Sequence, residues 1–414
     1  MRKYLMAALL AASGSATAAV QPFNNLQPSL AVTEVINPTG IYPSQGGGSA
    51  MGDMLGFVYG FAGTYAPGST LSALGQVLPI NQNQALFSIL GTTYGGDGST
   101  NFALPNLAGR AVIGAGSGAQ LGVPAGSASV TLTNSQLPAV QNQQPFSNVQ
   151  PSLPLQTLIA TNGIFPSPNS SSGASFIGQI ANFTGNFAPG GWAAANGQLL
   201  SISQNTALFS VIGTTYGGDG KTTFALPDLQ GRVAVGASNT VPIGTTFGQT
   251  STTLTQAQIN GAPVSNYQPS LAVNYLIATT GVFPSQGGGA GFDQTTPTLG
   301  EITAFAGNYA PGGWALANGQ LLSIQQNQAL FAILGTTYGG DGITTFALPD
   351  LQGRTLIGAD NVAYLVGGNY GTAQITLGAN NLPVPEPETW AMLLAGLGLL
   401  SFTVTRRMKA AATA

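Results

Sequence analysis

The chain has 414 residues, of which only 5% are charged, and it contains neither histidine nor cysteine. Globular proteins usually carry about 25% charged residues, so the surface must be wetted by Asn, Gln, Ser, Thr and the backbone, and it repels copies of itself weakly. Nine Lys and Arg residues cannot build a nucleic-acid-binding face. The missing side chains exclude imidazole and thiol catalysis, disulfides and the usual zinc, copper and iron ligand sets. We therefore expect no catalytic residues, no metal site and no cofactor.

The first 19 residues have the pattern of a secretory signal peptide. Arg2 and Lys3 provide a positive start, residues 4–12 are apolar, and Ala16-Thr17-Ala18 is a small-residue cleavage site. The alternative is a buried N-terminal helix, which the charged and small-residue flanks disfavour.

Residues 20–383 contain one unit three times. The segments LFSILGTTYGGDG, LFSVIGTTYGGDG and LFAILGTTYGGDG begin at Leu86, Leu208 and Leu330, at a constant spacing of 122 residues. A Gln-Pro-Ser-Leu segment opens each unit, at Gln27, Gln150 and Gln268. The predicted repeats are 20–142, 143–262 and 263–383. Each has the size of an independent domain, unlike the short stacked repeats of solenoids.

The third repeat shows the predicted elements in chain order. An apolar strand follows Gln268, and residues 300–323 predict two strands joined by the Pro-Gly-Gly turn at 311–313. Next comes one helix, capped by Ser323 and ended by Gly335, with an apolar stripe. Short extended pieces flank the Gly-Gly-Asp-Gly turn, and a β segment such as 250–254 closes the unit. The pattern predicts an α+β, β-dominated fold with short strands and one helix in each of three tandem domains.

Each repeat has one turn aspartate and one arginine at fixed positions. A single carboxylate per turn is too few for calcium, so an Asx-type turn that holds backbone amides is the favoured role of the aspartate. The arginine needs partners in a chain with so few charges. Asp228 and Asp350 lie four residues before their arginines, but the first repeat has Asn106 there. We therefore predict three structural pairs: Asp97–Arg110, Asp219–Arg232 and Asp341–Arg354.

Aromatic residues are the candidates for ligand contact. Trp192 and Trp314 follow Pro-Gly-Gly turns and, if exposed, would stack on a sugar ring; the alternative is a core anchor behind the turn. The tyrosines of the repeated GTTYGG segments are interpreted as packing residues.

The C-terminal residues 384–414 form a second processing signal. Val384-Pro385-Glu386-Pro387 precedes an apolar stretch, Trp390 to Val404, and a cluster of arginines. This order resembles the PEP-CTERM sorting signal. The resemblance implies transient anchoring in the inner membrane of a Gram-negative bacterium, cleavage by an exosortase, and release to the cell surface or extracellular matrix. A plain C-terminal membrane anchor is the alternative.

The repeats resemble the phage tail collar domain of tail fibres and of bacterial microcystin-dependent proteins. The resemblance rests on Phe-Ala-Gly, Pro-Gly-Gly-Trp, Gly-Thr-Thr-Tyr-Gly-Gly-Asp-Gly and Phe-x-Leu-Pro-Asp-Leu, and covers Gly52–Arg110, Gly178–Arg232 and Gly300–Arg354. The first repeat departs from it, with Gly68-Ser69-Thr70 in place of Gly-Gly-Trp. Some trimeric fibres of this family bind metal through histidines after a Val-Thr-Leu-Thr strand. Those histidines are absent here, so a metal site is not implied.

Together these observations predict a non-enzymatic, secreted surface or matrix protein. It would act by multivalent adhesion or self-association, with a trimer as one form, and its targets would be an exopolysaccharide or surface glycan, its own copies or a neighbouring cell. A receptor- or glycan-binding protein derived from a phage tail fibre is the alternative. A polysaccharide-cleaving enzyme would need paired carboxylates, and no such pair recurs in all three repeats.

Overall fold

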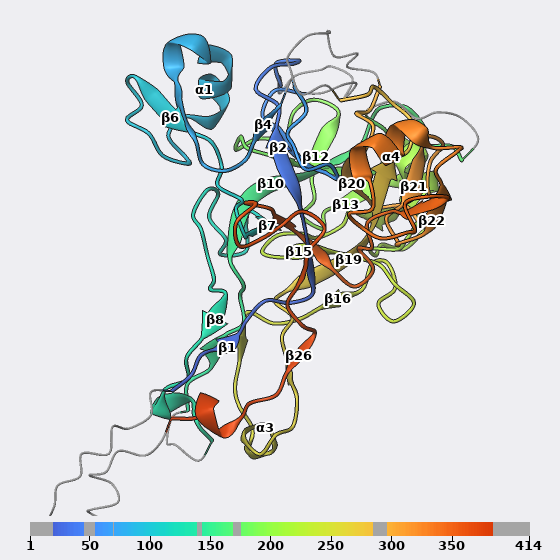
Figure 1. The fold of residues 1–414 in the computed structure, drawn as a ribbon. Coiled ribbons are helices and arrows are strands. Elements are labelled where there is room, and N and C mark those ends of the chain that lie inside the picture. Colours follow the sequence, from blue (N-terminus) through green and yellow to red (C-terminus); the bar gives the residue numbers. More distant parts are fainter. Residues whose placement is uncertain are drawn as a thin grey trace, which may run out of the picture.

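A computed structural model describes residues 20–44, 54–68, 70–138, 143–168, 175–284 and 296–383. They form a broad head above a narrow stalk (Figure 1). The predicted signal peptide and the sorting motif Val384–Pro387 lie outside the described residues. In the described part of the chain no helix is long and apolar enough to cross a membrane.

The three repeats carry closely similar sets of elements. In the first repeat these are β1 (Phe23–Asn24), β2 (Ser29–Ile36), β3 (Phe57–Phe61), β4 (Leu71–Ser72), β5 (Val77–Pro79), η1 (Ile80–Gln82), α1 (Gln84–Leu90), β6 (Asn101–Ala103), β7 (Ala111–Gly114), β8 (Ser129–Val130) and η2 (Asn134–Gln136). In the second they are β9 (Phe146–Ser147), β10 (Ser152–Ala160), β11 (Gln179–Phe183), β12 (Trp192–Ala194), β13 (Leu199–Ser201), η3 (Ile202–Gln204), α2 (Thr206–Ile212), β14 (Thr223–Ala225), β15 (Val233–Gly236), β16 (Thr246–Phe247), β17 (Ser251–Thr252) and α3 (Gln256–Ile259). In the third they are β18 (Val264–Ser265), β19 (Ser270–Ala278), β20 (Glu301–Phe305), β21 (Trp314–Leu316), β22 (Leu321–Ser323), α4 (Gln328–Leu334), β23 (Thr345–Ala347), β24 (Thr355–Gly358), β25 (Asn369–Tyr370), β26 (Gln374–Ile375) and η4 (Ala379–Asn381).

The predicted α+β, β-dominated fold with three similar units is confirmed. Two local predictions were wrong. The segment 300–323 forms three strands, because β20 and β21 both pair with β19 while β22 pairs with β23. Ser323 ends β22 and does not cap α4, whose N-cap is Asn327. Gly335 does end the helix, at a positive φ of 52° that favours glycine.

In space the three repeats close into a ring, although in sequence they follow one another. Strand β7 of the first repeat pairs in parallel with β10 of the second, and β15 of the second with β19 of the third. Strand β24 of the third repeat then pairs in parallel with β2 of the first. Each opening strand is thus completed by the preceding repeat, and the last repeat completes the first. Each repeat has the size of an independent domain, and its opening strand is paired with a strand of another repeat.

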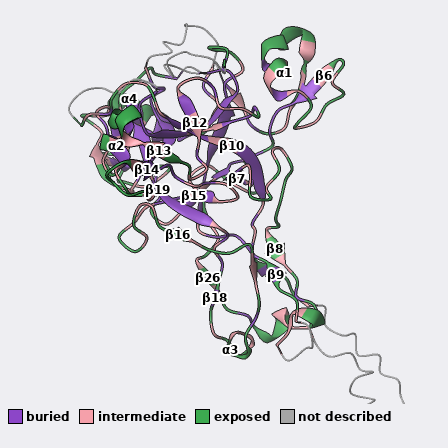
Figure 2. Ribbon diagram, turned by 180° about the vertical axis from the view of Figure 1, so that it is seen from behind, coloured by how far each residue is buried: buried purple, intermediate pink, exposed green. Residues whose placement is uncertain are grey.

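The centre of the head is a triangle of strands, one from each repeat. Strand β3 pairs with β11 and with β20, and β11 pairs with β20, always antiparallel and by two residue pairs. These strands and the long opening strands are the buried part of the head (Figure 2). The large hydrophobic core packed around them contains residues of all three repeats, so no repeat buries its apolar face alone.

The stalk has a small core of its own. Three antiparallel pairs form it, β1 with β8, β9 with β17, and β18 with β26. Its buried apolar residues come equally from the repeats: Phe23, Leu132, Phe146, Leu254, Val264 and Leu377. The two ends of the described chain meet at its foot, where the Gln21 amide donates to the Asn380 carbonyl at 2.7 Å. The head therefore lies at the far end of the stalk from both ends (Figure 1).

Candidate functional site

The turn aspartates hold their own turns. Asp219 Oδ1 accepts hydrogen bonds from the backbone amides of residues 221, 222 and 223, and its Oδ2 accepts from the Thr222 hydroxyl. Asp97 and Asp341 make the same set of contacts. These hydrogen bonds, first of all the one from the threonine hydroxyl, hold the pKa of each carboxyl well below its usual range. The Asx-type interpretation of these turns is confirmed.

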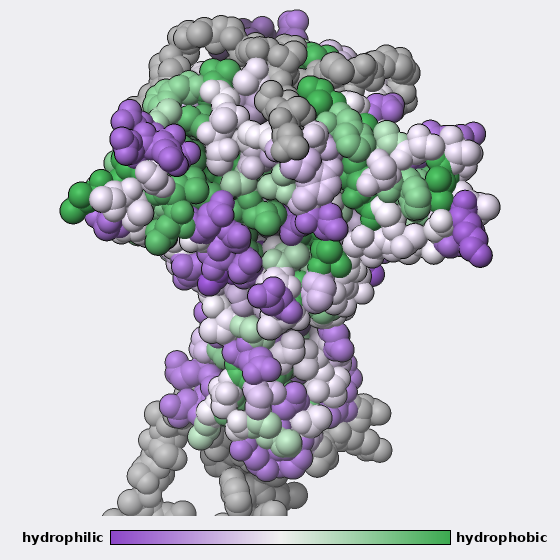
Figure 3. Space-filling view, turned by 90° about the vertical axis from the view of Figure 1, so that its right-hand side faces the viewer, coloured by the Kyte–Doolittle hydropathy of each residue, from purple (hydrophilic) through white to green (hydrophobic). Residues whose placement is uncertain are grey.

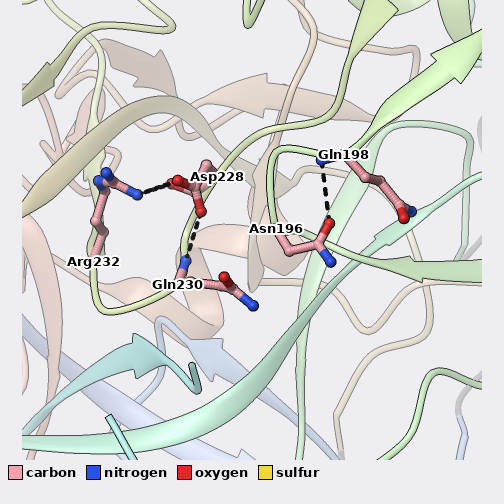
Figure 4. Close-up of polar contacts among 5 residues, drawn as sticks. All are labelled: Asn196, Gln198, Asp228, Gln230 and Arg232. Atoms are coloured by element: carbon pink, nitrogen blue, oxygen red, sulfur yellow. Dashed lines mark hydrogen bonds and ion pairs between the residues drawn. The ribbon is translucent and has the colours of Figure 1, made fainter. Parts of the chain in front are cut away.

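The predicted pairs between turn aspartates and arginines were wrong. Arg232 Nη1 lies 2.5 Å from Asp228 Oδ2, and Arg354 makes the same contact with Asp350 at 2.6 Å. Figure 4 shows the first pair, with Asp228 also accepting from the Gln230 amide. Arg110 has Asn106 four residues before it and donates to carbonyl oxygens instead, at 3.2 Å for Asn106. Arg232 and Arg354 each pair with the aspartate four residues before them, because this short spacing places both side chains on the same turn.

The two tryptophans are core anchors rather than exposed platforms. Trp192 is 8% exposed and Trp314 is 5% exposed. Trp192 packs on Phe57 of the first repeat, and Trp314 packs on Phe176 of the second. Each ring therefore joins neighbouring repeats, and neither offers a free face to a surface ligand.

The tyrosines of the GTTYGG segments also join the repeats in a circle. The hydroxyl of Tyr94 donates to the Thr184 carbonyl, that of Tyr216 to Ala306, and that of Tyr338 to Ala62, at 2.8 to 3.0 Å. Burial raises the pKa of all three phenols. Each bond crosses from one repeat to the next, so these packing residues fix the ring.

A second circle lies where the head meets the stalk. The Gln27 amide donates to Gln150 Oε1, the Gln150 amide to Gln268 Oε1, and the Gln268 amide to Gln27 Oε1, at 3.0 to 3.1 Å. The glutamine of the repeated Gln-Pro-Ser-Leu segment therefore closes the three-part ring. From the sequence alone, that segment indicates only where each repeat starts.

One set of aromatic side chains at equivalent positions is exposed. Tyr42, Phe165 and Phe283 each precede a Pro-Ser pair and are 54%, 49% and 51% exposed. We call these three residues the seam aromatics. These residues were not predicted as candidates from the sequence, although an aromatic residue before Pro-Ser in every repeat is a pattern that indicates them.

Hydrogen bonds place each seam aromatic at the boundary between two repeats. The Ser44 carbonyl, two residues after Tyr42, accepts from the Gly190 amide of the second repeat at 2.7 Å. Tyr309 of the third repeat donates to the Pro166 carbonyl, and Tyr65 of the first repeat donates to the Pro284 carbonyl. The head surface shows apolar patches among polar ones (Figure 3). The seam aromatics thus lie at three similar positions around the ring.

A cavity of about 70 Å³ lies where the three repeats meet. Its lining includes equivalent positions of β2, β10 and β19, where Glu34, Thr157 and Tyr275 stand. Its lining also includes residues of the central triangle, such as Gln179 and Glu301. We call this space the axial cavity. Burial raises the pKa of the Glu34 carboxyl to about 7.

The described residues contain no cluster of three or more acidic side chains that could hold a metal ion. Two features of the described residues are candidates for a binding site: the seam aromatics on the surface and the axial cavity where the repeats meet.

Comparison with protein families identifies the repeats and the tail. The Phage Tail Collar Domain matches residues 56–112, 178–234 and 300–356. The PEP-CTERM protein-sorting motif matches residues 383–407. No curated protein and no solved structure matches the chain. The chain thus carries three collar domains and a sorting motif that implies exosortase processing and secretion in a Gram-negative bacterium.

Proposed function

We propose that this protein is a non-enzymatic surface adhesin that binds a polysaccharide through its seam aromatics. The observation that carries the proposal is the exposure of an aromatic ring at the same position in all three repeats. An exposed ring stacks on the apolar face of a sugar, and a surface with few charges suits a neutral polymer. Three such points on one ring give avidity even where each contact is weak.

The shape of the molecule supports display of the head. The first and last described residues meet at the foot of the stalk, and the sorting motif follows directly after residue 383. A chain held at its C-terminal end would present the head outward. We propose that the mature chain reaches the cell surface or extracellular matrix in this orientation, after a signal peptide at 1–19 and transient anchoring in the inner membrane.

The test compares two triple variants. Y42A/F165A/F283A removes the seam aromatics, and V77A/L199A/L321A removes three exposed aliphatic side chains at equivalent positions that are 59%, 62% and 61% exposed. Binding to immobilised exopolysaccharide and to a glycan array is measured for both. We expect the aromatic variant to lose at least tenfold in apparent affinity while the control stays near wild type. Equal binding by both variants would contradict the proposal.

Two other outcomes separate the alternatives. If the aromatic variant changes the mass in solution but not glycan binding, the seam aromatics serve self-association instead. If antibody labelling finds the protein on phage-like particles, the phage-tail alternative holds and the surface-adhesin proposal is wrong.

A further inference from the structure

The neck between stalk and head has two polar layers on its axis (Figure 1). Each repeat passes through the neck as an Asn-x-Gln segment, and the segments are residues 25–27, 148–150 and 266–268. The backbone amide of each asparagine donates to the return strand of its own repeat or of the next, which continues the ladders of β1, β9 and β18. The segments are therefore extended, and side chains two residues apart point the same way.

The asparagines and glutamines of these segments point toward the axis. Two residues before each asparagine stand Phe23, Phe146 and Val264, which meet in the core of the stalk. Period-two alternation places the asparagine and then the glutamine on the same inward side. All six of these side chains are at most 2% exposed. The axis of the molecule thus passes from an apolar layer through an asparagine layer to a glutamine layer.

Backbone contacts fix which end of each amide is which. Nδ2 of every asparagine donates to a carbonyl of another repeat, at 2.6 to 3.0 Å; the pairs are Asn25 with Val149, Asn148 with Tyr267, and Asn266 with Leu26. Oε1 of every glutamine accepts from the backbone amide of a neighbouring glutamine. The remaining end of each asparagine is therefore an acceptor, and the remaining end of each glutamine is a donor.

These remaining ends lack partners among the described residues. Oδ1 of all three asparagines accepts no hydrogen bond, and Gln27 Nε2 and Gln150 Nε2 donate none. Gln268 Nε2 makes one long contact, 3.3 Å from Ser152 Oγ. Buried polar groups are nearly always hydrogen-bonded, and leaving one without a partner costs free energy. Five such groups in two adjacent layers favour an occupant of the neck.

We propose that the neck is a hydration site, with about two water molecules bound on the axis between the asparagine and glutamine layers, since a buried water makes about three hydrogen bonds. The occupant has to donate to the asparagine oxygens and accept from the glutamine N–H groups. A cation would meet the glutamine donors and an anion the asparagine oxygens, whereas water serves both layers. None of the six side chains is charged, which also favours a neutral occupant.

A hydrated layer also specifies how the three segments align. Sliding one segment by two residues would bring an asparagine into the apolar layer of Phe23 and Phe146 and would separate the water from its partners. A polar layer inside an apolar assembly selects one register in this way. This requirement explains why Asn-x-Gln stands before Pro-Ser-Leu in every repeat.

The experiment counts long-lived waters in the purified protein by oxygen-17 magnetic relaxation dispersion. The test variant N25L/N148L/N266L removes the three acceptors, and each carbonyl that loses an Nδ2 donor keeps a backbone amide donor, from residue 127, 249 or 372. The matched control N83L/N205L/N327L changes one partly exposed asparagine in each repeat, beside the start of its helix. N148L alone replaces the test variant if the triple change does not fold.

We expect the neck variant to lose about two long-lived waters and the control to lose none. An unchanged water count in the neck variant would overturn the proposal. A second measurement compares melting temperatures in sodium chloride, potassium chloride, choline chloride and sodium gluconate at equal ionic strength. A dependence on one cation or on chloride that is present in wild type and absent in the neck variant would show a bound ion instead of water, and would also overturn it. The neck shares no residue with the seam aromatics, so the glycan result does not decide this one.

Discussion

The outer turns and the axis of the head use the three repeats in different ways. In the outer turns Asp97, Asp219 and Asp341 make the same local hydrogen bonds, so each turn is held by residues of its own repeat. At the axis the equivalent residues differ, as Glu34 and Tyr275 show, and the contacts cross between repeats. The comparison indicates that turn structure is encoded within each repeat, whereas closure of the ring depends on all three together.

Among the contacts that close the ring, we expect the largest effect on stability where the backbones of two repeats lie close together. A Cβ built on Gly236 would lie 1.9 Å from the Leu351 carbonyl oxygen of the next repeat, which cannot move like a flexible side chain. We expect G236A to lower the free energy of unfolding by about 3–5 kcal/mol or to prevent folding. G378A is the control, because its nearest neighbouring atom would be 3.7 Å away. Denaturant unfolding followed by circular dichroism measures both; similar curves would contradict a closed ring.

The axial carboxylate should make stability depend on pH. Glu34 has a folded pKa of about 7 and an ordinary value of 4.5. Below pH 4.5 the group is neutral in both states, and as the pH rises toward 7 only the unfolded state ionises, so stability falls by about 3 kcal/mol. E34Q should remove this fall and be more stable than wild type at pH 8. Melting temperatures between pH 4 and pH 8, measured without added cations, check it; parallel curves would refute it.

A single closing hydrogen bond should have a smaller effect. Tyr216 donates to the Ala306 carbonyl across a repeat boundary. Y216F leaves that carbonyl without its donor, and we expect a loss of about 1–2 kcal/mol. Y42F is the matched control, because its hydroxyl contacts Ser88 at an exposed position. Equal stability of the two variants in urea would argue against a role of Tyr216 in closure.

The three turn aspartates should contribute to stability independently of one another. D97A, D219A and D341A should each lower the melting temperature by a similar, modest amount, because the contacts are local and alike. The lowered pKa of these carboxyls means that their contribution is present above pH 3.8 and is lost as the pH falls further. A calorimetric scan at pH 7 and at pH 3 tests this, and unequal losses at pH 7 would show that the turns are not independent.

The partly exposed ion pairs should contribute least. Arg232 and Asp228 have side chains 30% and 40% exposed, so solvent screens the pair. We expect R232A to cost less than about 1 kcal/mol, R354A the same, and R110A less, since Arg110 contacts only carbonyl oxygens. Thermal melts of the three variants rank them; a large effect of R110A alone would contradict this order.

The sequence by itself determined the local elements. Its repeated segments predicted the helix that ends at Gly335 and the Asx-type turns, because these depend on neighbours within a few residues. It also predicted the α+β class and three similar units. The predicted pair of Arg232 with the turn aspartate Asp219 was wrong. It assumed that the arginine has the same partner in all three repeats, whereas Arg232 pairs with Asp228, which lies only four residues before it.

Only the tertiary structure decided how the repeats meet. Burial of Trp192 against Phe57 and the circle of Gln27, Gln150 and Gln268 depend on contacts between residues more than 100 positions apart. A periodic sequence is equally compatible with domains in a row and with a ring. Periodicity shows that the repeats resemble one another, but it does not show whether the last repeat contacts the first. The pairing of β24 with β2 shows that the last repeat meets the first. It forms the third boundary between repeats, so that all three repeats surround the axial cavity.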